Sequence, residues 1–205
     1  MTEDHPQLYL VSPQRFEIDA FADDLARVLD ARPVACLRLI LPGDDEGEAR
    51  RAADRLRGVA HARDVAVVVS DTWKLVEPHG LDGVHLTDGP RRMREVRKAL
   101  GPDRIVGAFC GATRHAGMVA GEIGADYVSF GPVSEDAALG GEEIAPAELF
   151  EWWAQMIEVP LVAEGGFDPA IIEALSPHLD FIALGREIWS HPEGALAAIS
   201  GLIPS

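Results

Sequence analysis

Short apolar runs recur along the chain at fairly even intervals, and most of them are apolar at successive positions rather than at alternate ones. Strands that are buried on both faces have this pattern, which is typical of a parallel sheet. Eight runs are predicted to be strands: residues 8–12, 34–41, 65–70, 83–86, 104–109, 127–131, 159–165 and 180–185.

The segments between these runs carry helical patterns. In residues 16–31, for example, apolar side chains recur on one stripe at three- and four-residue spacing. Helix-start signals support other helices. The predicted helices are residues 16–31, 46–60, 72–77 and 90–100, one from Thr113 to near Gly124, one from Pro146, residues 169–176 after Asp168, and one from Pro192.

Eight strand–helix units in 205 residues predict a (β/α)8 barrel, an α/β fold with eight parallel strands. A doubly wound sheet is the alternative, but it would need fewer strands or a reversal of strand order. The sequence contains no linker or low-complexity tract. Residues 1–205 are therefore expected to form a single TIM-barrel domain.

Composition and charge narrow the class of function. Hydrophobic residues make up 47% of the chain, and no apolar run approaches the roughly 20 residues of a membrane span. The first residues lack the features of a signal peptide, and both Cys36 and Cys110 lie in strand-like runs, which argues against disulfides. A net charge of −16 argues against nucleic acid and anionic membranes as partners. We expect a cytoplasmic protein.

In this class of barrel the chemistry lies at the carboxyl ends of the strands. Gly165-Gly166 and Gly185-Arg186 follow the seventh and eighth runs, where these barrels commonly bind phosphate. Glycine lets a ligand approach the backbone amides, and Arg186 could add a charge-assisted hydrogen bond. Gly131, at the end of the sixth run, is included in this predicted phosphate site. The alternative is that the glycines only make tight turns.

Four charged or titratable residues at other strand ends are further candidates. Arg38 lies within an apolar run, so it needs a carboxylate partner or a polar barrel mouth. Asp71 and Asp88 could hold Mg²⁺ together with substrate phosphate oxygens, or each could cap the helix that follows it. His85, at the end of the fourth run, could be a catalytic residue or a hydrogen-bonded structural histidine.

Glu164 is a carboxylate that ends the seventh run, directly before the paired glycines. A carboxylate at the barrel mouth beside a phosphate loop is a candidate general base, and partial burial would raise its pKa. It could instead pair with Arg38 across the mouth. In that case the pair would be structural, and the arginine would lose its role with a ligand.

Six motifs point to a family. They are LYLVS, CLRLI, SD at 70–71, GLDGVHL, GADYVSFGPV and VPLVAEGG, and they follow one another along nearly the whole chain. In these motifs the chain resembles the thiamine phosphate synthase family, to which TenI-type thiazole tautomerases are related. The synthases join a pyrimidine diphosphate to a thiazole phosphate and release pyrophosphate, with Mg²⁺ and cationic groups stabilising the leaving diphosphate.

The resemblance implies roles for the matching residues. Arg38 would bind the diphosphate, Asp71 would bind Mg²⁺, and Gly165-Gly166 would hold the thiazole phosphate. It also implies a small phosphorylated thiazole or pyrimidine as ligand, and a homodimer.

The chain departs from the family pattern at several of these strand ends. In the second run, Cys36 replaces the family's Gln and Ile40 replaces its Lys. Pro90 replaces the second metal-binding Asp, and Phe109 replaces a Ser. Residues 134–141 replace a Thr-Pro-Thr-Lys loop. Glu164 replaces an apolar residue, Asp88 could substitute for the missing carboxylate only if its loop shifts, and Gly111 stands where the tautomerase has its histidine.

These replacements remove two lysines and add three carboxylates near a site for a phosphorylated ligand. Each close charge interaction is worth a few kcal/mol at an effective dielectric of about 20. We therefore predict a thiamine phosphate synthase-like protein with weak conventional synthase activity. The alternatives are a TenI-type isomerase, with Glu164 or His85 as base, and a relative that binds a phosphorylated ligand without turning it over.

Overall fold

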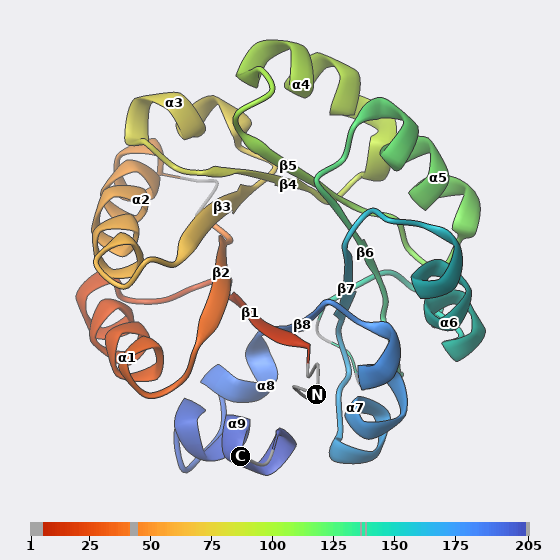
Figure 1. Cartoon of the computed structure of the whole chain (residues 1–205). Helices are drawn as coiled ribbons and strands as arrows, with labels where there is room; N and C mark the ends of the chain where they lie inside the picture. The colour runs from red at the N-terminus through yellow and green to blue at the C-terminus, as the bar shows by residue number, and fades with distance from the viewer. Residues whose placement is uncertain (1–5, 42–44, 136, 138, 204–205) are drawn as a thin grey trace.

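The computed structural model describes residues 6–41, 45–135, 137 and 139–203. Its eight strands are all parallel and close into a barrel in chain order, surrounded by helices (Figure 1). The strands are β1 (Gln7–Val11), β2 (Val34–Leu39), β3 (Ala66–Ser70), β4 (Gly83–Leu86), β5 (Ile105–Phe109), β6 (Tyr127–Phe130), β7 (Leu161–Glu164) and β8 (Phe181–Leu184). The predicted (β/α)8 barrel is confirmed, and the doubly wound alternative is wrong because the sheet closes on itself.

The helices follow the strands with short 3₁₀ turns between some of them. They are α1 (Ile18–Ala31), α2 (Glu46–His61), η1 (Trp73–Leu75), α3 (Val76–His79), η2 (Gly89–Arg92), α4 (Met93–Leu100), α5 (Arg114–Ile123), α6 (Ala147–Met156), α7 (Pro169–Leu175), η3 (Ser176–His178), α8 (Arg186–Trp189) and α9 (Ala195–Leu202). Thr113 and Asp168 cap α5 and α7 through their side chains, as predicted. The last helix begins after Gly194 rather than at Pro192, and α8 was not predicted.

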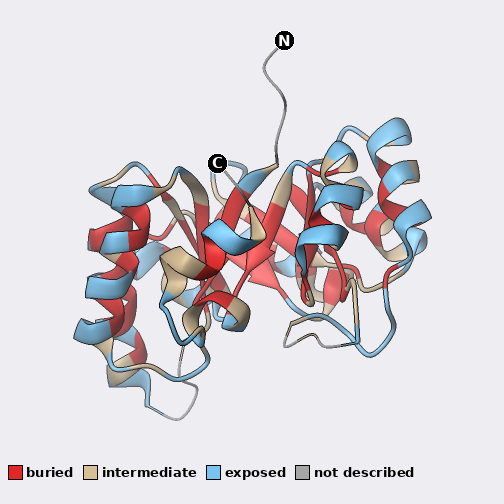
Figure 2. Cartoon of the chain, turned by 90° about the horizontal axis from the view of Figure 1, so that it is seen from below, coloured by how far each residue is buried: buried red, intermediate tan, exposed pale blue. Residues whose placement is uncertain are grey.

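Buried residues form the barrel wall and the inner faces of the helices, as Figure 2 shows. A second, smaller cluster fills the barrel interior: Tyr9, Val11, Cys36, Val68, Tyr127, Val162 and Ala183. Gly107 leaves space for one of these side chains, since a Cβ there would lie 2.0 Å from the ring of Tyr127. The interior is therefore packed, as is usual in this fold.

A repeated aspartate fixes the strands at their amino ends. Asp82, Asp126 and Asp180 each directly precede an even-numbered strand, and each accepts a hydrogen bond at Oδ2 from a backbone amide of the preceding strand. The donor–acceptor distances are 2.7, 2.7 and 2.8 Å. This arrangement ties neighbouring strands together at the face that serves stability rather than chemistry.

Several smaller predictions are also tested. Cys36 and Cys110 are free and buried, so the expectation of no disulfide between them is confirmed. Trp153 packs α6 against the barrel, and His115 is exposed. Among the described residues, no helix combines the length and the apolar character that crossing a bilayer would require.

Candidate functional site at the carboxyl ends of the strands

Polar side chains occupy the carboxyl half of the barrel interior. Successive residues of a strand point to opposite faces, so residues two positions apart face the same way. The interior cluster includes one residue from each of β2, β3, β6 and β7, namely Cys36, Val68, Tyr127 and Val162. The residues two positions further along these strands also point inward. These four residues are Arg38, Ser70, Ser129 and Glu164. They form the floor of the barrel mouth.

Arg38 and Glu164 form a buried ion pair across this floor. Nη1 of Arg38 donates to Oε2 of Glu164 over 2.7 Å, and the two side chains are only 3% and 4% exposed. Burial opposes the charge on Arg38, but Glu164, Tyr9 and Tyr127 outweigh it and raise the pKa of the guanidinium. The pairing expected as one alternative for Glu164 is therefore confirmed. Its role as a general base stays a prediction.

A chain of three buried side chains lies beside this pair. The hydroxyls of Tyr9 and Tyr127 are 2.8 Å apart, and the Tyr127 hydroxyl is 2.9 Å from Nδ1 of His85. Burial lowers the pKa of His85 well below its usual value, and the charge of Arg38 lowers it further. His85 is therefore neutral at pH 7. The hydrogen bond to Tyr127 agrees with the prediction that His85 is a hydrogen-bonded structural histidine. A catalytic role for His85 stays a prediction.

On the floor of the mouth and in the adjoining hydrogen-bonded chain, four buried polar atoms have no hydrogen-bond partner within the described part of the chain. They are Nε of Arg38, Oγ of Ser70, Nε2 of His85 and Oγ of Ser129. Buried polar groups in proteins are almost always paired, so each exception needs an explanation. All four belong to side chains of the mouth's floor or of the adjoining hydrogen-bonded chain. Together they offer donors and acceptors to a small polar ligand.

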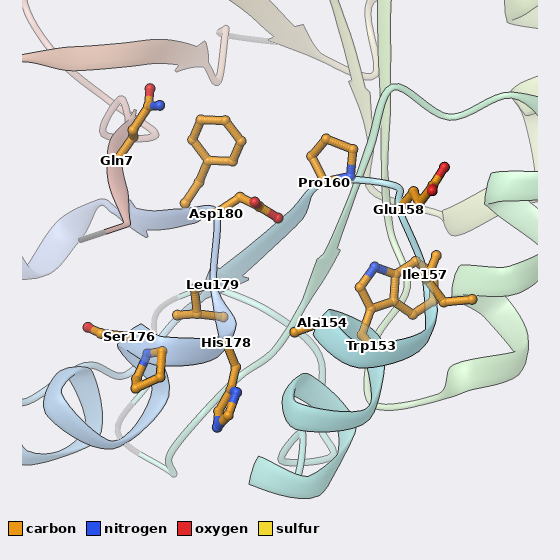
Figure 3. Close-up of a pocket in the computed structure, with 12 residues that line it drawn as sticks. Gln7, Trp153, Ala154, Ile157, Glu158, Pro160, Ser176, His178, Leu179 and Asp180 are labelled. Atoms are coloured by element: carbon orange, nitrogen blue, oxygen red, sulfur yellow. The ribbon is translucent and has the colours of Figure 1, made fainter. Parts of the chain in front are cut away.

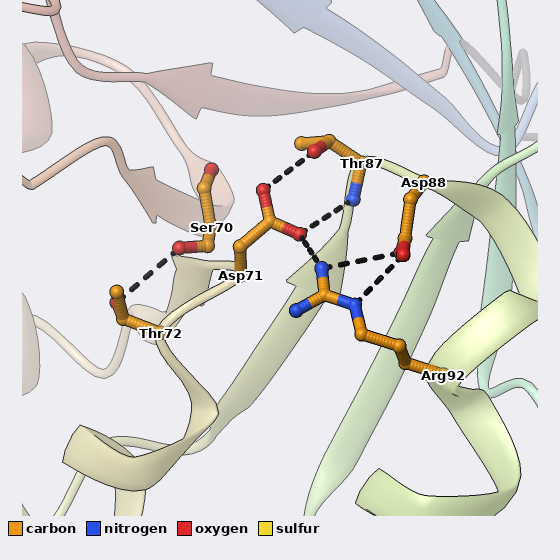
Figure 4. Close-up of polar contacts among 6 residues, drawn as sticks. All are labelled: Ser70, Asp71, Thr72, Thr87, Asp88 and Arg92. Carbon is orange, nitrogen blue, oxygen red and sulfur yellow. Dashed lines mark hydrogen bonds and ion pairs between the residues drawn. The ribbon is translucent and has the colours of Figure 1, made fainter.

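Asp71 lies in the turn after β3 and connects it to the turn after β4. Its φ of 58° is in the left-handed region, which aspartate tolerates better than most residues. The carboxylate accepts from the amide and hydroxyl of Thr87, over 3.0 and 2.5 Å, and from Nη2 of Arg92 over 2.6 Å (Figure 4). The alternative that Asp71 caps the next helix is wrong, because Thr72 precedes η1 and no side chain makes a capping bond there.

Asp88 also binds Arg92 instead of capping a helix. Asp88 precedes η2 but makes no side-chain capping bond. Its two carboxylate oxygens accept from Nε and Nη2 of Arg92, over 2.7 and 3.2 Å. The hydrogen bonds that Arg92 donates to Asp88 and the charge of Asp71 raise the pKa of Arg92, although partial burial opposes this. Among the described residues, no group of three or more His, Cys, Asp or Glu side chains could hold a metal.

The predicted phosphate glycines lie against the segment that follows β6. Gly165 and Gly166 have φ of 84° and 85°, and a Cβ on them would lie 2.2 Å from the Leu139 carbonyl oxygen and 2.3 Å from the Ser134 hydroxyl. That hydroxyl donates to the Gly166 carbonyl over 2.7 Å. The close approach that requires glycine here is thus made by the chain itself. Binding of phosphate at these glycines stays a prediction.

Gly131 and Gly185 are also positions of close approach. A Cβ on Gly131 would lie 2.0 Å from the carbonyl oxygen of Glu164, and one on Gly185 would lie 2.9 Å from Cδ1 of Leu139. Leu139 packs on the interior cluster and so partly covers the mouth. Asp136, one of the two carboxylates that the sequence adds to this segment, lies outside the described residues.

The turn after β8 carries Arg186 and Glu187. Arg186 is exposed, and it starts α8. Glu187 is largely covered; burial raises the pKa of its carboxyl, while the backbone amides at Glu187 and Gly185 oppose the shift. Its Oε1 atom is buried without a hydrogen-bond partner among the described residues. Binding of phosphate at Gly185 and Arg186 stays a prediction.

A groove of about 460 Å³ lies at the opposite end of the barrel. Figure 3 shows Gln7 at the start of β1 and Pro160 before β7 on one side, with Trp153 of α6 and His178 of η3 on the other. Asp180 also lines it and accepts from the amide of Leu161. In this fold the chemistry lies at the carboxyl ends of the strands, so size alone does not make this groove the functional site.

Sequence reasoning missed four polar residues at the mouth, Tyr9, Arg92, Tyr127 and Ser129, and it noted Ser70 only as part of the motif at 70–71, without a role. Arg92 lies four residues after Asp88, a spacing at which opposite charges meet on a helical turn. Tyrosines in buried strands need a partner for the hydroxyl, which was a second available signal. Ser70 and Ser129 each lie two positions after an inward-facing residue of the same strand, so the alternation of side chains along a strand predicts that they also point inward.

Comparisons with known proteins agree with this architecture. Residues 8–188 match the profile of the thiamine monophosphate synthase family. The chain is 40% identical over 198 residues to a thiamine-phosphate synthase of Rhodospirillum centenum, covering 95% of this chain and 94% of that protein. It is 39% identical over 199 residues to one of Erythrobacter litoralis, covering 95% and 93%.

The fold is likewise that of a thiamine phosphate pyrophosphorylase of Pyrococcus furiosus, with a TM-score of 0.80, 19% identity and coverage of 96% of this chain and 93% of that one. The profile match covers most of the chain, and the two relatives match it over nearly their whole length. The chain therefore belongs to the thiamine monophosphate synthase family, whose role is in thiamine biosynthesis.

Proposed function

We propose that the barrel mouth binds a small phosphorylated thiazole, and that conventional coupling of this thiazole to a pyrimidine diphosphate is weak. The observation that carries the proposal is the set of unpartnered buried atoms on Arg38, Ser70, His85 and Ser129. A ligand with nitrogen and oxygen atoms would satisfy groups that otherwise cost free energy in the folded protein. Membership of the family supports the choice of ligand.

The charges at the mouth support weak coupling. Arg38 is bound to Glu164, and Arg92 is bound to Asp71 and Asp88. These two cations are therefore neutralised before any substrate arrives. A leaving diphosphate gains stabilisation only from charges that are directed at it, so these two arginines contribute little.

The proposed Mg²⁺ at Asp71 and Asp88 does not fit the residues as they are arranged. Both carboxylates are occupied by Arg92, and Asp71 by Thr87 as well. No step of the proposed function is therefore assigned to a metal ion. In the proposed binding mode Ser129 and His85 orient the ligand, and the Arg38–Glu164 pair holds the floor in place.

Calorimetric titration with the thiazole phosphate tests the proposal. Binding should be measurable for the wild type and several-fold weaker for Ser129→Ala. Ser190→Ala, an exposed serine in the turn after α8, is the matched control and should bind as the wild type does. No binding by the wild type, or equal binding by the two serine variants, would contradict the ligand site.

A second assay tests the coupling reaction. The protein is given the pyrimidine diphosphate, the thiazole phosphate and MgCl₂, and the formation of thiamine phosphate is followed. Slow or absent turnover, with thiazole phosphate still bound, is expected. Turnover at an ordinary synthase rate would refute the proposed weakness.

The isomerase alternative needs its own measurement. Proton exchange on the thiazole carboxylate phosphate would be followed with the wild type and with Glu164→Gln. Because the Glu164 carboxylate is bound to Arg38, we expect little exchange from the wild type. Exchange that Glu164→Gln abolishes would instead support Glu164 as the base.

A further inference from the structure

The contacts of Arg92 support an inference about how the site handles charge. Nη2 of Arg92 contacts one oxygen of Asp71 over 2.6 Å and one oxygen of Asp88 over 3.2 Å (Figure 4). Nε contacts the second Asp88 oxygen over 2.7 Å. We propose that Arg92 is a built-in cation, which takes the place between the two carboxylates that a divalent ion would otherwise occupy.

All four carboxylate oxygens of this network are already used. Both Asp88 oxygens accept from Arg92, one Asp71 oxygen accepts from the Thr87 hydroxyl, and the other is shared by the Thr87 amide and Arg92. Mg²⁺ requires a near-octahedral shell of oxygen ligands. To enter here it would have to displace the guanidinium, and with the guanidinium in place it would meet a positive charge at short range.

The backbone holds this arrangement in position. The amide of Asp71 donates to the carbonyl of His85 over 3.0 Å, so the turn after β3 is tied to the end of β4. Arg92 ends η2 four residues after Asp88, at the spacing that brings the two side chains together. Arg92 is therefore fixed by two separate turns, and its position does not depend on one flexible contact.

One nitrogen of Arg92 is left for a ligand. Within the described part of the chain no hydrogen bond uses Nη1, and in Figure 4 this atom points away from both carboxylates. A phosphorylated ligand at this strand end would then accept one hydrogen bond from Nη1 without a bridging ion, while Asp71 and Asp88 already balance the charge of the guanidinium. This consequence rests on the proposed function, whereas the replacement of the metal ion by Arg92 does not.

Titration with Mn²⁺ alone, followed by the loss of the free-ion electron paramagnetic resonance signal, tests the inference without any ligand. The wild type should show no binding that depends on Asp71. Arg92→Gln removes the cation and keeps a polar amide of smaller size, so it should bind Mn²⁺ about tenfold more tightly or better. Adding Asp71→Asn to Arg92→Gln should abolish that gain.

Arg91→Gln is the matched control, because Arg91 is an exposed arginine on the same turn. It should behave as the wild type does. Wild-type binding of Mn²⁺ that Asp71→Asn removes would overturn the inference, whether or not the Arg92 variant folds. Equal Mn²⁺ affinity of Arg92→Gln and Arg91→Gln would also overturn it. A negative result in the thiazole titration concerns the proposed function alone.

Discussion

Replacing Glu164 by Gln should strongly destabilise the protein, because it leaves the Arg38 guanidinium buried without a counter-charge. The pair is separated by 2.7 Å, and its side chains are 3% and 4% exposed. Breaking a pair this deeply buried costs about 3–5 kcal/mol. Unit charges about 4 Å apart interact by about 4 kcal/mol at an effective dielectric of about 20, which agrees.

The loss is measured by urea unfolding, followed by far-ultraviolet circular dichroism and by the fluorescence of the four tryptophans. In thermal unfolding of a chain of this size, the same loss corresponds to a fall of roughly 6–20 °C in the melting temperature. The double variant Arg38→Met/Glu164→Leu should recover most of the loss, since apolar replacement of a whole buried pair is often neutral or stabilising.

Glu46→Gln is the matched control, because Glu46 pairs with Arg50 on the exposed face of α2. Exposed pairs contribute about 0–1 kcal/mol, so this variant should unfold almost as the wild type does. A loss of less than about 1 kcal/mol for Glu164→Gln would place the pair in the same range. It would mean that water reaches Arg38, and the account of a buried floor would be wrong.

Three further predictions concern the same end of the barrel. Tyr127→Phe removes the hydroxyl that joins two buried partners, and should cost about 1–3 kcal/mol in urea unfolding; no change would mean that the partners pair elsewhere. The pKa of Glu187 is raised in the folded protein, so the folded state holds this proton more tightly than the unfolded state does, and wild-type stability falls as the pH rises above about 4.5. Glu187→Gln lacks the titrating group and should therefore become more stable relative to the wild type over that pH range. A stability difference between the two proteins that does not change with pH would contradict this. Gly166→Ala should cost about 1–3 kcal/mol from its φ of 85° and its contact with Ser134. Gly111 has φ of 60° but open space around it, so Gly111→Ala should lose less stability than Gly166→Ala. Equal losses would mean that the contact with Ser134 does not contribute to the cost at Gly166.

The strands and most helices could be predicted from the sequence because their signals are local. The run at 83–86 coincides with β4, and the cap at Asp168 begins α7 as expected. The last helix was misplaced because Pro192 is followed by Gly194, whose φ of 88° keeps the chain in a turn until Ala195. Pro192 favours the start of a helix and Gly194 favours a turn, and the sequence alone does not show which of the two preferences prevails.

The candidate site was predictable only in part. Arg38 in an apolar strand had to have a partner or a polar mouth, and the sequence alone indicated this. It also placed Asp71 and Asp88 at strand ends that the barrel brings together. The i, i+4 spacing of Asp88 and Arg92 was visible as well, but nothing local joined Asp71 to the same guanidinium.

The sequence by itself thus determined the barrel, the positions of its strand ends and the need to neutralise a buried arginine. These features are visible in the pattern of apolar and polar residues within short segments of the chain. The tertiary structure decided which groups meet: Glu164 pairs with Arg38 from 126 positions away, and Tyr9 meets Tyr127 across 118. It also decided that the chain's own segment after β6 approaches the paired glycines. Contacts between distant residues depend on how the closed sheet is assembled, and no local pattern encodes that distance.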